Sequence, residues 1–362
     1  QVVSGNQSVS AGKFKLTSSY RDYTVKEMRF TVNSNSIVIS TATLKDAATG
    51  PTLATMPVSS SGDFRFTGLS VLVPTSTSKR VDLYYNLIAD PSATNASWNL
   101  NTAAILTYVK YADSQGTETE VNPPTAASNT ANTTLVYRAV PTLANVAVGN
   151  TKIINGAEMD LYKFTVAAPT QGPIHMKQFK IDVNWSDAAT GDTLELEGLK
   201  LLENGVDITS TVTIVDEDSA TSLKGTAVGA SELNSKIIIT WDADTEESTT
   251  ATGTTTTYTL KGTPQGFNVA GAADTGKDAV ALQFVPDASA QTSGYNFINQ
   301  GTTLTGIEKL FSSSTADASA ENANLIWSDE SAVAHSQDDD ASTKDWSNSY
   351  LFTTVSSQSL SY

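Results

Sequence analysis

Two segments of the chain decide its fold: VKEMRFTVN at residues 25–33 and MKQFKIDVN at residues 176–184. In the first segment Met28, Phe30 and Val32 alternate with polar side chains, and the second segment repeats the pattern almost residue for residue. A period of two residues places alternate side chains on opposite faces of an extended strand. The chain is therefore expected to contain the same half-buried β-strand twice.

The two-residue period recurs in short runs along the whole chain. The runs end at Gly, Pro, Asn, Asp or Ser, which is typical of strands joined by turns. Because each strand has one apolar and one polar face, antiparallel sheets packed face to face are favoured. Residues 304–311 alone have a spacing that suits a short helix. The sequence predicts an all-β fold from these runs: residues 13–17, 28–33, 80–87, 162–166, 179–185, 193–198, 258–262 and 279–284.

The repeat extends beyond these two segments. Residues 2–19 resemble residues 146–168, and residues 80–90 resemble residues 236–244, about 147 residues further along in the first case. Such spacing predicts two homologous antiparallel Ig-like β-sandwich domains in tandem, with the boundary near the Pro-, Asn- and Thr-rich stretch 122–134. The predicted parts are domain 1 (residues 1–138), domain 2 (139–300) and a C-terminal extension of domain 2 that is a candidate exchanged strand (301–362).

Composition and charge exclude several classes of protein. The chain has 362 residues, 38 acidic and 22 basic side chains, a formal net charge of −16 and no Cys. An acidic chain lacks the basic surface that nucleic acids require, and no apolar run approaches the ~18 residues of a membrane-spanning segment. The first residue is Gln1 rather than Met, which predicts export after removal of a signal peptide, to the cell surface or beyond. An artificially shortened chain is the alternative.

The sequence offers little that could perform catalysis. His175 and His335 are far apart, and each is interpreted as a surface histidine. No motif of a serine hydrolase, a nucleotide-binding loop or a zinc protease is present, so we predict no enzyme activity, no catalytic residue and no cofactor. Acidic clusters at residues 216–218, 242–247 and 338–340 are interpreted as solvated surface. A single Ca²⁺ in one of these loops is the alternative.

Tryptophan side chains are the candidates for sugar binding, because aromatic faces stack on sugar rings. Trp185 and Trp241 are in phase with apolar residues of their strands and are expected in the core. Trp327 and Trp346 flank an Asp- and Ser-rich segment and are expected to be exposed, while Trp98 is left unassigned. These residues support a cell-surface adhesin or carbohydrate-binding module, with surface glycans as partners, as the alternative function.

Three parts of the chain resemble a known group of proteins. The junction LVYRAVPTLANVAV (residues 135–148), domain 2 and the closing segments WSDESAVAHS (327–336) and STKDWSNSY (342–350) resemble secreted Ser/Thr-rich tandem β-sandwich surface proteins of the Patescibacteria (candidate phyla radiation) type. The resemblance implies a secreted surface protein and does not specify its role.

The function predicted from these observations is a structural subunit of an extracellular filament or surface layer (S-layer). Domain 2 is expected to be entered through the strand LVYRAV and the connector PTLAN (residues 141–145). Domain 1 has no such entry segment, so it is predicted to accept a strand from another copy. A head-to-tail contact of this kind continues into a polymer. The alternative is that the C-terminal tail is the last strand of its own domain. The candidate interface residues are Val2 and Val3 at the N-terminus and Leu351, Phe352 and Val355 in the tail.

Overall fold

The chain divides into two compact units, unit 1 (Gln1–Arg138) and unit 2 (Ala139–Tyr362). The computed structural model describes residues 2–3, 8–32, 39–88, 99–101, 104–123, 133–187, 193–217, 221–225, 227–229, 236–241, 247–267, 278–288, 323–331 and 346–362.

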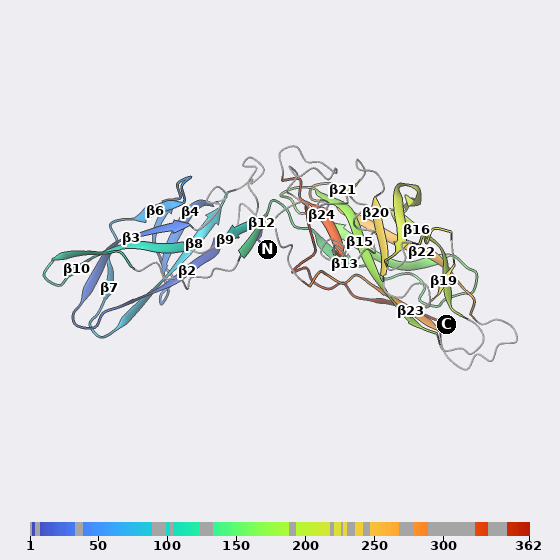
Figure 1. The fold of residues 1–362 in the computed structure, drawn as a ribbon, viewed down its shortest axis with the longest axis horizontal. Coiled ribbons are helices and arrows are strands. Elements are labelled where there is room, and N and C mark those ends of the chain that lie inside the picture. Colours follow the sequence, from blue (N-terminus) through green and yellow to red (C-terminus); the bar gives the residue numbers. More distant parts are fainter. Residues whose placement is uncertain are drawn as a thin grey trace. The chain divides into compact units, whose positions relative to one another are not determined.

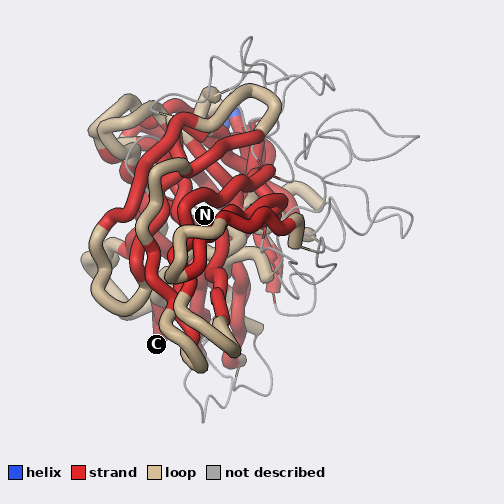
Figure 2. Tube along the Cα trace, turned by 90° about the vertical axis from the view of Figure 1, so that its left-hand side faces the viewer, coloured by secondary structure: helices blue, strands red, loops and turns tan. Residues whose placement is uncertain are grey.

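Regular structure in the described residues is almost entirely β (Figures 1 and 2). The one helical element among them is a 3₁₀ turn at Thr209–Thr211. The all-β prediction is therefore confirmed, and the expected short helix at residues 304–311 lies outside the described part of the chain. None of the described helical structure has the length and apolar character needed to cross a membrane.

Unit 1 contains two larger antiparallel sheets, with strand orders β2-β8-β4-β5 and β11-β10-β3-β6, where β7 also pairs with β3. A small third sheet has the order β1-β12-β9. The strands of unit 1 are β1 (Val2–Val3), β2 (Ser8–Thr17), β3 (Tyr23–Val32), β4 (Ile39–Asp46), β5 (Thr52–Pro57), β6 (Asp63–Phe66), β7 (Val71–Val73), β8 (Ser78–Leu87), β9 (Asn99–Asn101), β10 (Ala104–Asp113), β11 (Glu118–Val121) and β12 (Thr133–Tyr137).

The core of unit 1 lies between its two larger sheets. Phe14 of β2 meets Phe30 of β3 with ring centroids 5.0 Å apart, and Phe64 of β6 meets Tyr85 of β8 at 6.0 Å. Each ring belongs to an apolar position of an alternating strand, so the alternation directs these side chains into one shared core.

Unit 2 repeats this arrangement with additional strands. Its sheets have the orders β13-β14-β22-β16-β17, where β19 also pairs with β16, and β18-β20-β15-β23-β26, to which β21, β24 and β25 are attached. The strands of unit 2 are β13 (Thr142–Asn145), β14 (Met159–Ala167), β15 (Ile174–Ser186), β16 (Glu195–Glu203), β17 (Val206–Asp207), β18 (Val212–Asp216), β19 (Val228–Gly229), β20 (Lys236–Trp241), β21 (Ser248–Thr250), β22 (Thr255–Gln265), β23 (Ala279–Gln283), β24 (Leu325–Ser328), β25 (Trp346–Ser347) and β26 (Gln358–Ser361).

Strand pairing shows which parts of the two units correspond. Met28 of β3 lies opposite Phe66 of β6, and its counterpart Phe179 of β15 lies opposite Ile239 of β20. Strand β8 pairs with β2 as β22 pairs with β14. The proposed match of residues 80–90 with 236–244 is therefore wrong: β20 corresponds to β6, and β8 corresponds to β22. Both segments are apolar strands, and alternation does not encode the neighbour with which a strand pairs.

The segment between the repeats also belongs elsewhere than expected. Strand β12 pairs with β9 and β1, and Val136 is fully buried in the core of unit 1. The first part of LVYRAV is thus the last strand of unit 1, and the expectation that it leads into unit 2 is wrong. Unit 2 begins instead with β13. Val136 of β12 is buried in unit 1 because the strands that pair with β12, β1 and β9, belong to unit 1.

Candidate functional site

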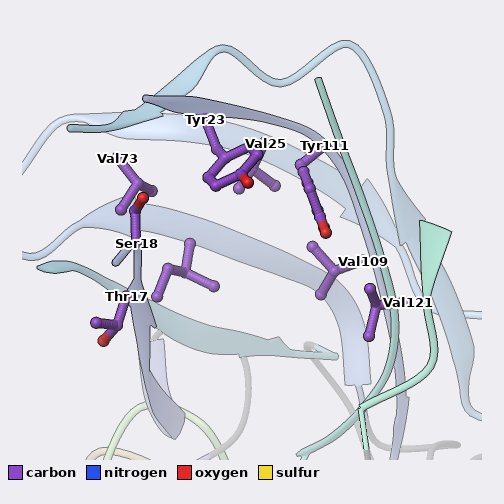
Figure 3. A pocket seen from close by; sticks show the side chains of 9 residues that line it. Thr17, Ser18, Tyr23, Val25, Val73, Val109, Tyr111 and Val121 are labelled. Atoms are coloured by element: carbon purple, nitrogen blue, oxygen red, sulfur yellow. The ribbon is translucent and has the colours of Figure 1, made fainter. Parts of the chain in front are cut away.

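A groove lies in unit 1 beside the end of β2. It has a volume of about 260 Å³. Val109 and Val121 lie on one side of it and Val73 on another, with Tyr23 and Tyr111 between them (Figure 3). The walls are mostly apolar, so the groove suits an apolar side chain rather than an ion or a polar small molecule.

The edge of β2 borders this groove. Strand β2 pairs with β8 on one side, and no strand pairs with its other side in the part of the chain that the structure describes. The backbone N–H of Ser18 donates to the carbonyl of Thr77 on the β8 side, at 3.1 Å. Because backbone groups of successive strand residues point to opposite edges, those of Thr17 and Lys15 point away from β8. The edge therefore presents unpaired main-chain donors and acceptors.

The corresponding edge in unit 2 is covered. Strand β14 pairs with β22 on one side and with β13 on the other. Thr142 lies opposite Ala167 and Asn145 opposite Phe164, and the N–H of Val146 extends the ladder by donating to the carbonyl of Lys163 at 2.9 Å. The short segment that precedes the second repeat thus completes the sheet at this edge.

The C-terminal tail of unit 2 is hydrogen-bonded to both of its sheets. Asn145 Nδ2 and Tyr162 OH both donate to the carbonyl of Ser356, at 3.1 and 3.3 Å. From the other sheet, Gln283 Nε2 donates to the carbonyl of Val355 at 3.0 Å. Residues 355–356 are therefore held between the edges of both sheets.

Side-chain burial records the difference between the two edges. Phe164 and Val166 of β14 are 2% and 0% exposed. Their counterparts Phe14 and Leu16 of β2, which share the Lys-Phe pattern, are only partly buried. The same alternation in sequence thus gives fully buried apolar side chains in unit 2 and partly exposed ones in unit 1.

The predicted interface residues of the tail lie within unit 2. Val355 is 4% exposed, and Phe352 packs on Trp327 with ring centroids 5.7 Å apart. Leu351 is 59% exposed, with a left-handed φ of 69°. Strand β26 pairs with β23, so the tail is the last strand of its own unit. This is the alternative that the sequence left open.

The predicted interface residues at the N-terminus also pair within their own unit. Val2 lies opposite Val136 and Val3 opposite Tyr137, in a parallel pair with β12. Of the tail residues, the structure brings Phe352 onto Trp327, and it pairs Val2 and Val3 with β12 within unit 1. The sequence indicated that PTLAN precedes only the second repeat, but it did not show that this segment forms a strand on β14 or that β2 is the edge left without one.

Two of the tryptophans are not where the sequence placed them. Trp327 and Trp346 are 0% and 2% exposed, so the expectation that they lie at the surface is wrong. They belong to the paired strands β24 and β25, and Trp327 Nε1 donates to the carbonyl of Asn348 at 3.0 Å. The Asp- and Ser-rich sequence near them indicated a loop, but the tryptophans themselves lie in a strand pair. Trp241 is 3% exposed as predicted, Trp185 is half-buried, and Trp98 lies outside the described residues.

Buried polar groups occur in unit 2. His175 is 7% exposed and its Nδ1 lies 2.6 Å from Glu247 Oε1, so its interpretation as a surface histidine is wrong. Lys180 lies 2.7 Å from Glu217, and burial lowers the pKa of Lys180 while Glu217 opposes that shift. The contact with Glu217 supplies the partner that the buried charge of Lys180 requires. His335 lies outside the described residues.

The acidic clusters are only partly described. Asp216 is 1% exposed and Glu217 forms the pair with Lys180, so these two residues are not a freely solvated surface. Residues 242–246 and 338–340 lie outside the described part. Within the described ranges, no three His, Cys, Asp or Glu side chains are grouped so that they could hold a metal ion.

Comparisons with known proteins provide no family for this chain. No protein-family model and no curated protein matches it. A solved structure of an anti-sigma factor domain-containing protein is similar at 9% identity and a TM-score of 0.21, covering 76% of this chain and 78% of that one. A BSP domain of a biofilm associated protein is similar at 8% identity and a TM-score of 0.18, covering 78% of this chain and 57% of that one. Similarities this weak carry no conclusion about fold or function.

Proposed function

We propose that this chain is a non-enzymatic structural subunit of an extracellular filament or surface layer, assembled head to tail from copies of itself by strand addition. One observation carries the proposal: the edge of β2 has no partner among the described residues, whereas the equivalent edge of β14 is covered by β13. An exposed strand edge is a template for pairing with another chain. Strand addition derives affinity from main-chain hydrogen bonds and register from alternate side chains.

The asymmetry of the chain supports a polymer rather than a closed dimer. The open edge belongs to unit 1, while unit 2 covers its own edge. A donor segment elsewhere on the neighbouring copy would therefore meet a different surface, which makes the contact heterologous. Heterologous contacts continue into filaments unless their rotation closes a ring. The extracellular location is part of the proposal and rests on the resemblance to secreted surface proteins.

Sedimentation of the full chain over a wide concentration range tests the proposal, together with negative-stain electron microscopy. We expect oligomers whose size grows with concentration, and filaments or sheets on the grid. A chain that stays monomeric at the highest concentration, with both units folded, would overturn self-assembly. Cleavage of a polysaccharide by the purified chain would overturn its non-enzymatic character.

A further inference from the structure

We infer that the acceptor groove of unit 1, defined as the outer edge of β2 at Lys13–Thr17 together with the adjoining 260 Å³ cavity, binds one extended segment of the β13 type. The segment is uncharged, has apolar residues at alternate positions and runs antiparallel to β2. The inference deepens the proposed function, on which it rests for the source of the segment, namely another copy of this chain.

The direction of the bound segment follows from unit 2. Strand β13 is antiparallel to β14, and it begins opposite Ala167 and continues to Phe164. The counterpart of Ala167 in β2 is Thr17, which borders the cavity. A segment of the same polarity therefore enters unit 1 at the Thr17 end of β2 and passes the cavity first.

The side-chain pattern of β13 defines what the groove would recognise. Thr142 and Ala144 are exposed, whereas Leu143 between them is partly buried and lies opposite Val166. The counterpart of Val166 is Leu16, which lines the cavity. A cavity of about 150 Å³ accommodates a benzene ring, so 260 Å³ leaves room for a leucine or a larger side chain. An apolar residue at the Leu143 position would thus be the anchor.

Unit 2 has a larger, buried ring at the register position of Tyr111, which lines the groove of unit 1. Trp327 lies opposite Met176, in the register that Tyr111 has opposite Val25 in unit 1. Trp327 is completely buried under Phe352, while Tyr111 is only partly buried and lines the cavity. Unit 1 has the smaller ring and lacks a described side chain in the place of Phe352.

The lysines of β2 set the charge of the partner. Lysine on an edge strand discourages unspecific pairing, and Lys13 and Lys15 are both exposed. They do not prevent strand addition, because Lys163, the counterpart of Lys13, accepts a hydrogen bond from Val146 in unit 2. Uncharged segments are therefore accepted, and basic segments are repelled.

A labelled peptide with the sequence AVPTLANVAVGN, residues 139–150, tests the inference with the full chain. We expect saturable binding of one peptide per chain by fluorescence anisotropy. A peptide with Leu143→Asp should bind at least about tenfold more weakly, since the anchor is lost. Absence of saturable binding, or equal binding of both peptides, would overturn the inference.

Two chain variants locate the binding. Lys15→Pro removes an N–H that points away from β8. It should weaken peptide binding by about tenfold while β2 stays paired with β8. Its matched control Lys15→Ala keeps the N–H and should bind like the wild type. Val121 lines the cavity and is partly exposed. Val121→Trp should fill the cavity and exclude the anchoring side chain of the peptide, while the sequence of β2 is unchanged. Binding that survives both Lys15→Pro and Val121→Trp in folded protein would contradict the assignment.

The same variants separate this inference from the proposed function. A chain that binds the peptide and yet remains monomeric supports the acceptor groove and overturns self-assembly. A chain that polymerises, with polymers unaffected by Lys15→Pro and by excess peptide, supports the structural role and overturns the groove as its contact. Polymers that the peptide shortens and that Lys15→Pro prevents would support both.

Discussion

Unit 1 and unit 2 share the strand order β2-β8-β4-β5 and β14-β22-β16-β17, and in unit 2 the outer edge of this sheet carries the additional strand β13. In unit 2, β13 covers β14 and the tail fills the space between the sheets, so Phe164 and Val166 are buried. In unit 1, the equivalent residues Phe14 and Leu16 remain partly exposed beside an open cavity. Alternation thus predicts which face of a strand is apolar, but it does not predict whether that face is fully buried. Whether its core is complete depends on segments that lie far away in the sequence.

Deleting residues 349–362 should have the largest effect, and it should act on unit 2 alone. The deletion removes β26 and the burial of Val355 and Leu360, each of which contributes about 1.5–3 kcal/mol. It also removes Ser349, whose Oγ donates to Asp287 at 2.6 Å and whose N–H donates at 2.8 Å. Calorimetry should show the transition of unit 2 lowered or lost. An unchanged unit 2 transition would show that the tail is not part of its core.

A matched pair of core substitutions measures the difference between the edges directly. Phe164→Ala should cost about 3–5 kcal/mol of unfolding free energy, the range for a fully buried phenylalanine. Phe14→Ala should cost roughly half as much, because its ring is only partly buried. Urea unfolding of each variant checks the prediction. Equal costs in the monomer would mean that the edge of β2 is already covered.

Glu27 should make unit 1 sensitive to acid. Burial alone would raise the pKa of Glu27. Hydrogen bonds donated by Arg65 and by Arg29 (2.9 Å) hold this pKa below its usual value. A lowered pKa in the folded state contributes stability above the unfolded-state pKa, and this stability is lost as the pH falls through the folded-state pKa. The stability lost in Glu27→Gln, measured by urea unfolding, should therefore be largest near pH 7 and shrink below about pH 4.

Glu203 should change the pH dependence of the stability of unit 2 in the opposite direction to Glu27 in unit 1, and by a smaller amount. Burial raises its pKa, although Ser248 Oγ donates to it at 2.9 Å and opposes the shift. A raised pKa contributes stability that is complete below the unfolded-state pKa and is lost as the pH rises through the folded-state pKa. Glu203→Gln should therefore gain stability relative to the wild type between about pH 4 and pH 7. A gain that does not depend on pH would show that Glu203 does not titrate there.

The strands themselves could be predicted from the sequence, whereas the strands and side chains that lie next to them could not. The strands of residues 80–87 and 236–241 were expected and exist, but their neighbours were assigned wrongly. Trp327 was expected at the surface because Asp and Ser follow it, yet β15 and β25 pair with its strand and bury it. His175 was expected to be exposed and is buried beside Glu247, which is 72 residues away in the chain.

The sequence by itself determined the all-β class, because the two-residue period is a property of each short segment and reports one buried face wherever the segment lies. Tertiary structure alone decided which edge is covered. Strand β13 pairs with β14 and the tail is hydrogen-bonded to Gln283 in unit 2, while the edge of β2 has no described partner. The physical reason is that main-chain hydrogen bonds between strands are the same for every residue type, so a strand does not encode its neighbour. That choice depends on how distant segments share one core.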